Sequence, residues 1–204
     1  MPELLHHPLA SHVLTKLRDK NTPAAEFRAL SYKIGLMLAL EATKDLPTDV
    51  ETIDTPLETM DASVLGEGLA VVPILRAGLG MLQPFTDLFP SVSVGYLGLE
   101  RDHETAEPSA YYNKLPDVTS RRVLCVDPML ATGGSAVMAL DKLKAAGATD
   151  IRLVTIVSAP EGIETVKAAH PDVPIITAAV DRELDDNSYI LPGLGDFGDR
   201  LFDT

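Results

Sequence analysis

Residues 123–140 read VLCVDPMLATGGSAVMAL, and this stretch decides the fold. An apolar run ends at Asp127, a short loop carries Thr132 to Ser135, and a helical pattern follows. A buried strand, a glycine turn and a helix in this order are typical of a parallel α/β sheet. Small loop residues let backbone N–H groups converge, and a helix N-terminus adds about half a positive charge. The segment therefore predicts a phosphate site.

A carboxylate at the end of the strand adds a second requirement for the ligand. Asp127 would repel phosphate, but it can accept hydrogen bonds from two neighbouring hydroxyls, as on ribose. Together the loop and the carboxylate indicate a sugar phosphate. The local pattern leaves one alternative open, in which Thr132 or Ser135 caps a helix and the glycine pair only forms a turn.

Strands and helices alternate on both sides of this segment. We expect strands at 69–75, 91–99, 121–126, 151–159 and 173–180, and helices at 79–89, 135–148 and 161–170. This order predicts a mostly parallel sheet with helices on both faces and ligands at the carboxyl ends of the strands. Upstream, the spacing predicts two helices, over 9–17 and from a cap at Thr22-Pro23 onward. Two polar, proline-broken stretches remain: 47–61 predicts extended or hairpin structure, and 101–116 predicts a mobile loop or hairpin arm.

Composition narrows the class of protein. The chain has 204 residues, enough for one domain, and a formal charge of −13 from 17 basic and 30 acidic residues. This charge disfavours nucleic acid or an anionic membrane as a partner, and an anionic substrate needs basic groups gathered at its site. The single cysteine, Cys125, is expected to be a buried strand residue in a reduced, cytoplasmic protein. We expect no signal peptide, no membrane span and no zinc site among the five histidines.

Two familiar nucleotide motifs do not fit. No lysine follows the glycines after Asp127, which excludes a P-loop. Residues 193–198, GLGDFG, match the dinucleotide-binding pattern by letter but lie too near the end of the sequence for the helix and strand that it requires.

Four segments together carry a family resemblance: LRAGLGM at 75–81, ERDHETAEP at 100–108 followed by YYNKLP at 111–116, VDPMLATGGS at 126–135, and YILPGLGDFGDR at 189–200. In this order and spacing they resemble the uracil phosphoribosyltransferases of the type I phosphoribosyltransferase superfamily. The resemblance implies an α/β fold, with a twisted, mostly parallel sheet flanked by helices, a small hood and a protruding hairpin arm. It implies one domain over 1–204, a hood formed by the N-terminal helices and residues 182–204, and a flexible arm at about 101–116.

The resemblance also implies a reaction. The enzyme would transfer the 5-phosphoribosyl group from 5-phospho-α-D-ribose 1-diphosphate (PRPP) to N1 of uracil, giving UMP and diphosphate. Mg²⁺ is the implied cofactor, carried by the diphosphate with no direct protein ligand. The implied partners are these small molecules, with GTP as a candidate activator, and a second copy of the chain in a homodimer or homotetramer.

Site residues are carried over by their place in the four segments. Arg76, Arg101, Asp127 and Asp196 are implied to be catalytic. The residues implied to bind PRPP are Arg76, Arg101, Asp127, Pro128, Met129, Leu130, Ala131, Thr132, Gly133, Gly134, Ser135 and Asp196. Those implied to surround uracil are Ile190, Gly195, Asp196 and Phe197. Read from the residues alone, Arg101 could instead be a surface ion pair and Asp196 a turn residue.

Two positions depart from the family pattern. Type I relatives often carry two adjacent acidic residues where this chain has Asp127-Pro128, which weakens the case for a protein-bound metal. Phe197 stands where a small residue is usual and could reshape the base pocket. The segment from Tyr189 to Phe197 has glycines but no Asn, Gln, Arg or Lys, so we expect uracil to be read by backbone groups.

Two alternatives to the uracil enzyme remain at this point. One is a phosphoribosyltransferase for another base, which the GLGDFGDR segment and Pro128 disfavour. The other is an RNA-binding attenuator of pyrimidine operons on the same fold. That role needs a basic face, which a charge of −13 disfavours.

Overall fold

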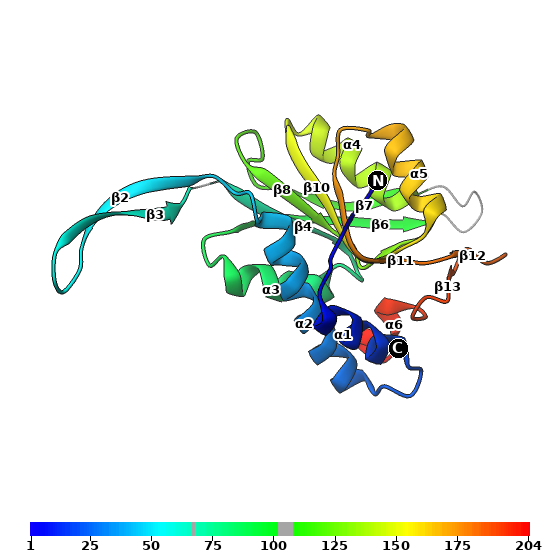
Figure 1. Cartoon of the computed structure of the whole chain (residues 1–204). Helices are drawn as coiled ribbons and strands as arrows, with labels where there is room; N and C mark the ends of the chain where they lie inside the picture. The colour runs from blue at the N-terminus through cyan, green and yellow to red at the C-terminus, as the bar shows by residue number, and fades with distance from the viewer. Residues whose placement is uncertain (67, 102–107) are drawn as a thin grey trace.

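The structure, a computed structural model, describes residues 1–66, 68–101 and 108–204 (Figure 1). Within these residues a nine-stranded sheet runs in the order β1-β11-β10-β8-β4-β6-β7, with β5 beside β4 and β9 beside β10. Its strands are β1 (Glu3–Leu4), β4 (Leu69–Leu75), β5 (Ser93–Val94), β6 (Tyr96–Arg101), β7 (Pro108–Lys114), β8 (Arg122–Val126), β9 (Met129–Leu130), β10 (Asp150–Ser158) and β11 (Ile175–Val180). All its pairings are parallel except β6 with β7. The predicted parallel α/β sheet is confirmed.

The described chain has six helices: α1 (Pro8–Arg18), α2 (Ala24–Thr43), α3 (Leu79–Leu88), α4 (Gly134–Ala145), α5 (Pro160–Ala169) and α6 (Phe197–Phe202). Figure 1 shows α4 and α5 on one face of the sheet and α2 and α3 on the other. Alternate residues of each strand feed the two cores: Leu124 and Val126 pack with α2 and α3, and Val123 and Cys125 with α4 and α5. Burial on both faces is why the strands read as continuous apolar runs.

One detail of the N-terminal helices differs from the prediction. The expected cap at Thr22 is wrong, because its hydroxyl donates to the carbonyl of Lys16 at 2.6 Å and Pro23 takes the N-cap position of α2. Helix α2 therefore starts without a side-chain cap, and the fixed φ of Pro23 favours its first turn instead. Burial of Cys125 in β8 is confirmed, and burial raises the pKa of its thiol.

The hood lies beyond the carboxyl ends of the strands. It consists of α1, the first half of α2, α6 and the two-stranded ribbon of β12 (Glu183–Leu184) with β13 (Ile190–Leu191) (Figure 1). Phe197 on α6 packs edge-on against Phe27 of α2, with ring centroids 5.2 Å apart. The N-terminal helices and the C-terminal segment are thereby packed into one small subdomain.

Two hairpins leave the body of the protein. The sequence predicts extended or hairpin structure at 47–61, and the structure has a hairpin: β2 (Thr48–Asp54) pairs antiparallel with β3 (Thr59–Leu65) and projects far from the sheet (Figure 1). β6 and β7 form the second hairpin and extend the sheet at its edge. The tip of the expected arm at 101–116, residues 102–107, lies outside the described part of the chain.

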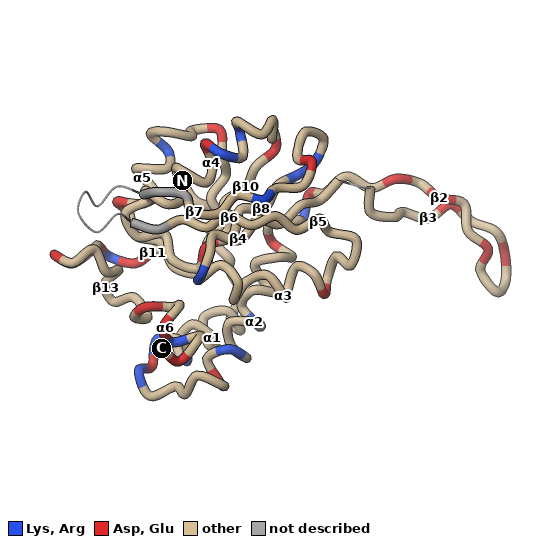
Figure 2. Tube along the Cα trace, turned by 180° about the vertical axis from the view of Figure 1, so that it is seen from behind, with Lys and Arg blue, Asp and Glu red and all other residues tan. Residues whose placement is uncertain are grey.

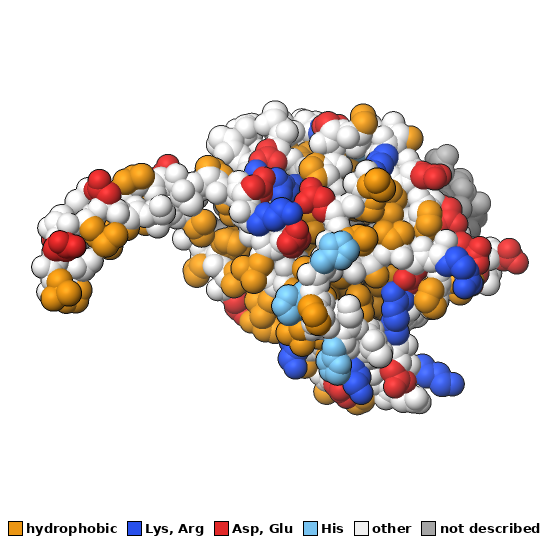
Figure 3. All heavy atoms as spheres, in the orientation of Figure 1, with side chains coloured by type: hydrophobic (Ala, Val, Ile, Leu, Met, Phe, Trp, Pro, Cys, Tyr) orange, Lys and Arg blue, Asp and Glu red, His pale blue; other side chains and the backbone are white. Residues whose placement is uncertain are grey.

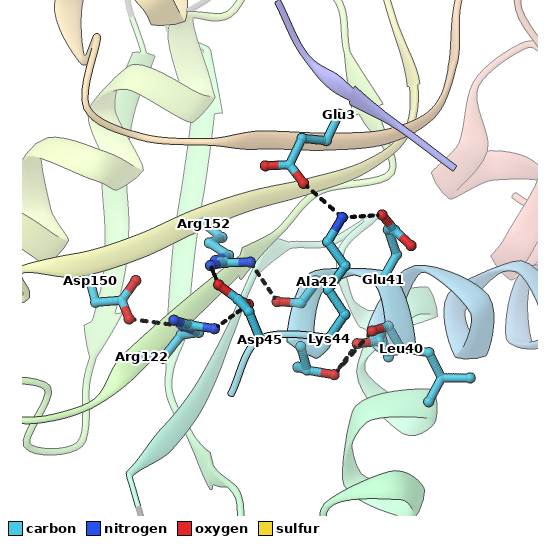
Figure 4. Close-up of polar contacts among 11 residues, drawn as sticks. Glu3, Leu40, Glu41, Ala42, Lys44, Asp45, Arg122, Asp150 and Arg152 are labelled. Atoms are coloured by element: carbon cyan, nitrogen blue, oxygen red, sulfur yellow. Dashed lines mark hydrogen bonds and ion pairs between the residues drawn. The ribbon is translucent and has the colours of Figure 1, made fainter. Parts of the chain in front are cut away.

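The amino ends of the strands are held by a network of ion pairs, shown in Figure 4. Arg122 at the start of β8 bonds Asp45 and Asp150, each at 2.8 Å, and Arg152 of β10 bonds Asp45 at 2.6 Å. The hydrogen bond from Arg152, assisted by Arg122, holds the pKa of Asp45 below its usual range. The network ties the end of α2 to the two central strands, on the side of the sheet opposite the hood.

Candidate active site

β4 and β8 end side by side, and the loops that follow them meet at the carboxyl edge of the sheet. Pro73 of β4 pairs with Val126 of β8. The turn at 76–78 folds back on this edge so closely that a Cβ on Gly78 would lie 2.6 Å from the carbonyl oxygen of Val126. Only glycine permits that approach. The loop that carries Arg76 is thereby fixed next to Asp127.

The expected phosphate loop, 127–135, is held from two sides. The carbonyl oxygen of Pro128 accepts hydrogen bonds from Ile156 and Val157, and that of Leu130 accepts one from Ala159. On the other side α5 packs so tightly that a Cβ on Gly162 would lie 2.3 Å from the carbonyl oxygen of Ala131.

The loop passes into α4 through a glycine. Gly133 takes a left-handed conformation with φ of 88°, occupies the N-cap of α4 and provides no side chain to cap it. The first turn of α4, from Gly134 and Ser135 onward, therefore offers its amide N–H groups to an anion. This is the arrangement that the sequence predicted for this loop.

Asp127 is partly buried at the base of this loop. Burial raises the pKa of its carboxyl to about 7, opposed by a hydrogen bond from the amide of Met129 at 3.4 Å. A carboxylate in such a place gains from ligand hydroxyls that can satisfy it.

A cavity of about 300 Å³ lies above these loops. Its lining comes from three separate places in the sequence: Ala77, Met129, Ala131, Asn187, Ser188, Tyr189, Ile190, Gly195, Asp196, Phe197 and Gly198. All four positions expected around uracil lie here beside two from the expected PRPP loop. The structure therefore brings the loop after β4, the loop after β8 and the hood segment 187–198 around one space.

Sequence reasoning missed two polar lining residues. Asn187 and Ser188 occupy the turn between β12 and β13, where Asp185 accepts hydrogen bonds from the amides of Asn187 and Tyr189. Ser188 takes a positive φ of 66°. The polar run DDNS before Tyr189 marks a turn in the sequence, but not that the turn faces a cavity.

The structure shows what Phe197 and Asp196 do in the hood. Phe197 is 1% exposed, and its ring lies between Phe27 and the first turn of α3, where a Cβ on Gly80 would come within 2.9 Å of it. The ring thus helps to build the hood core. Asp196 lines the cavity and also caps α6, accepting a hydrogen bond from the amide of Asp199 at 2.9 Å.

Of the two arginines expected at the diphosphate, one has a described side chain. Arg76 is 62% exposed, lies 3.6 Å from a carboxylate oxygen of Asp199 and stacks over Phe202 at 5.9 Å. Arg101 ends β6, and its side chain belongs to the part of the chain that is not described. Arg76 is therefore exposed and weakly paired, so an anion could compete for it.

A larger cavity, of about 820 Å³, opens at the amino ends of the strands. Gly68, Leu69, Ser93, Arg121 and Asp150 are among its lining residues. Parallel α/β sheets bind ligands at their carboxyl ends, so size alone does not make it the active site.

Solved structures share this fold. The chain superimposes on a hypoxanthine-guanine phosphoribosyltransferase from Bacillus anthracis with a TM-score of 0.55, 12% identity and coverage of 78% of this chain and 80% of the other, a likeness of fold alone. It matches the AQ2163 protein of Aquifex aeolicus with a TM-score of 0.94 and 37% identity over 99% of this chain and 98% of the other. The fold is that of the type I phosphoribosyltransferases.

The sequence comparisons are more specific. The family model described as uracil phosphoribosyltransferase matches residues 4–204. A uracil phosphoribosyltransferase from Dictyoglomus thermophilum is 55% identical, over 98% of this chain and 98% of the relative. One from Oceanobacillus iheyensis is 53% identical, over 97% of this chain and 96% of the relative. The chain belongs to the uracil phosphoribosyltransferase family. The resemblance in its sequence is confirmed, and the alternative of an enzyme for another base is set aside. No helix in the described chain is both long and apolar enough to cross a membrane.

Proposed function

We propose that this enzyme transfers the 5-phosphoribosyl group of PRPP to N1 of uracil, releasing diphosphate. The observation that carries the proposal is the cavity of about 300 Å³, whose walls come from the loops after β4 and β8 and from the hood segment 187–198. A donor on the loops and a base under the hood would meet there. Both would then lie at the carboxyl edge of a parallel sheet, where α/β enzymes hold their ligands.

The donor half of the site matches the chemistry of PRPP. The first turn of α4 would hold the 5-phosphate, and Asp127 would accept hydrogen bonds from the ribose hydroxyls. Arg76 would leave Asp199 for the more highly charged diphosphate. Arg101 is proposed for the same task from the end of β6. These groups would concentrate positive potential locally in a chain whose formal charge is −13.

Mg²⁺ is proposed as the cofactor. No group of three His, Cys, Asp or Glu side chains that could hold a metal lies within the described chain. Mg²⁺ retains several waters and needs few protein ligands when it binds substrate phosphates, so these residues are compatible with an ion that arrives on the diphosphate. When bound, it would neutralise charge on the leaving group. Asp196 lines the cavity, and Asp127 lies at the base of the proposed donor loop.

The reaction requires positioning more than proton transfer. The bond from C1′ to the diphosphate oxygen breaks with its electron pair going to diphosphate, and the N1–C1′ bond forms as N1 loses its proton. Positive charge builds on the ribose ring on the way, as in glycoside hydrolysis. The chain would hold N1 behind the ring and stabilise the negative charge that leaves with diphosphate, chiefly through Arg76 and Arg101.

Backbone groups in the hood are proposed to read the base. Gly195 lines the cavity with φ of 81°, and no hydrogen bond within the described chain engages its N–H or its C=O. Uracil offers an acceptor at O4 and a donor at N3, which a backbone N–H and C=O would match. The amide of Asn187 and the hydroxyl of Ser188 add polar groups to the same wall. Cytosine reverses both positions and would leave buried groups unsatisfied.

We also propose that two copies associate through the hairpin β2–β3. Every residue of β2 is exposed, and two cross-strand partners, Ile53 and Met60, remain 38% and 46% exposed on one face. Figure 2 shows acidic but no basic residues along the hairpin, and Figure 3 shows apolar side chains among them. An isolated two-stranded hairpin is marginally stable in water, so this one gains most from a partner surface.

The oligomer has its own test. The double variant Ile53→Lys, Met60→Lys should have the molar mass of a monomer by light scattering. Thr52→Lys, on the opposite face of the hairpin, should retain the mass of the dimer. An unchanged mass in the double variant would contradict the role of the hairpin. Activation by GTP and a cytoplasmic location stay predictions, the first testable by rates with and without GTP.

The experiment that tests the function is a measurement of diphosphate release from PRPP and Mg²⁺ with uracil, hypoxanthine or orotate as acceptor. Release that depends on uracil, with UMP as the product, is expected. Release with another base and not with uracil would refute the proposal. Retention of a pyrimidine-operon leader RNA on the protein, without turnover, would favour the attenuator instead.

A further inference from the structure

The hood segment that lines the cavity depends on distant residues for its shape. Its ribbon, β12 with β13, is separate from the central sheet and has two residue pairs, Glu183 with Leu191 and Leu184 with Ile190. Beyond the ribbon, the chain from Gly193 to Asp196 is irregular up to α6. A backbone that reads a base must be held to within about 0.5 Å, and the ribbon alone does not reach Gly195.

A buried ion pair holds the first of these residues. Asp181, directly after β11, has a side chain that is 5% exposed and a bidentate ion pair with Arg18, at 2.6 and 2.7 Å. The same Asp181 carboxylate accepts the N–H of Gly193 at 2.8 Å, and Arg18 donates to the C=O of Gly193 at 2.7 Å. Both polar backbone groups of Gly193 are therefore held by one pair of side chains.

A second arginine holds the next peptide group. Arg200 on α6 donates to the C=O of Leu194 at 2.7 Å, to that of Asp19 at 2.7 Å and to that of Leu17. Its guanidinium also stacks on Phe27, 4.4 Å from the ring centroid. The last turn of α1, whose carbonyls have no partner within the helix, is thus part of the support for the hood segment.

The two supports end where the cavity begins. Gly193 and Leu194 are engaged by them, and the next residue, Gly195, faces the cavity. None of the three charged side chains lines the cavity itself. We propose that Arg18, Asp181 and Arg200 are positioning residues that fix the backbone around Gly195 and so determine uracil affinity and base selectivity. This inference rests on the proposed function, in which the hood segment reads uracil.

The proposal predicts an effect on one substrate and not on the other. Displacing a reading group by about 1 Å can cost about 100-fold in rate, so Arg18→Ala should raise the KM for uracil by about 10-fold or more. Apart from Asp196, the proposed PRPP site is built on the other side of the cavity, by α4 and the loops after β4 and β8. The KM for PRPP should therefore change by less than about 2-fold, within the range of ordinary surface substitutions.

Steady-state kinetics of four variants test this split. Arg18→Ala and Asp181→Asn should each raise the KM for uracil and lower the preference for uracil over cytosine. Their double variant should show no further increase, because both act through the same contacts with Gly193. Arg18→Lys retains the charge but not the two-pronged contact, so its KM should fall between those of the wild type and Arg18→Ala.

Arg122→Ala is the matched control. Arg122 also joins distant elements through two ion pairs of 2.8 Å, and its side chain is 12% exposed, but it lies at the amino ends of the strands. The Arg122→Ala variant should have a lower Tm and an unchanged KM for uracil.

An unchanged uracil KM in Arg18→Ala and Asp181→Asn, or equal increases for uracil and PRPP, would overturn the proposal. If Arg18→Ala fails to fold, Arg18→Lys decides by the same criterion. A wild-type enzyme inactive with uracil would instead refute the proposed function.

Discussion

The carboxyl of Asp127 should make donor binding depend on pH. Its pKa is raised to about 7 because the folded chain partly desolvates it, whereas an ordinary aspartate titrates near pH 4. The Asp127 carboxyl would be ionised in about half of the free enzyme molecules at pH 7 and in about a tenth at pH 6. If only the ionised form accepts hydrogen bonds from both ribose hydroxyls, the KM for PRPP should rise about 10-fold from pH 8 to pH 6.

Asp127→Asn is the perturbation that isolates this group. Losing charge-assisted hydrogen bonds worth about 1.5–3 kcal/mol should lower kcat/KM for PRPP by about 10- to 100-fold at pH 8. PRPP has phosphate groups that titrate near pH 6 on their own. The variant retains that contribution, so the difference between the two pH profiles reports Asp127 alone.

The same substitution should affect stability in the opposite direction. The folded pKa of Asp127 lies above its unfolded value, so the folded state binds its proton more tightly. Its free energy of unfolding therefore falls as pH rises from about 4 to about 7 and stays lowered above that range. Without ligand, Asp127→Asn should raise Tm at pH 8 and leave it nearly unchanged at pH 4. A variant with near-normal kinetics, or pH profiles that run parallel, would refute the assignment of Asp127 to the ribose.

Three further predictions concern the donor loops and the base. Arg76→Ala and Arg101→Ala should each raise the KM for PRPP or lower kcat by about 10-fold or more, with a smaller change for uracil; equal effects on both substrates would argue against diphosphate contacts. Gly162→Ala places a Cβ 2.3 Å from the carbonyl oxygen of Ala131, so it should cost about 1–3 kcal/mol of stability and weaken PRPP binding, seen by calorimetry. The enzyme should accept 5-fluorouracil, because the Phe197 ring is packed into the hood. It should favour uracil over cytosine by about 10⁴ in kcat/KM, because cytosine reverses the donor and the acceptor that the backbone would match, and comparable values for the two bases would exclude backbone reading.

Local sequence patterns were enough to predict the sheet and the donor loop. The run that ends at Asp127, the glycines and the following helix lie within eighteen consecutive residues, 123–140, and so does the chemistry that they indicate. Alternating apolar runs gave the parallel sheet because burial on two faces leaves a mark on every strand. The cap at Thr22 was wrong because a hydroxyl can choose among several nearby acceptors, and the sequence does not rank them.

Contacts between distant residues decided the rest. The sequence indicates that Phe197 could reshape the base pocket, and only the packing of α2 and α3 around it shows that its ring belongs to the hood core. Asn187 and Ser188 became lining residues because the ribbon folds over the sheet, which no local pattern records.

The raised pKa of Asp127 and the ion pair of Arg18 with Asp181 depend equally on tertiary structure. The second joins residues 163 apart in the sequence. The sequence by itself determined the main elements, the strand–loop–helix at Asp127 and the family, because these follow from neighbouring residues and their order. Only the tertiary structure decided how the cavity is closed, how strongly Asp127 is desolvated and which side chains hold the backbone around Gly195, because each depends on groups that meet only when the chain folds.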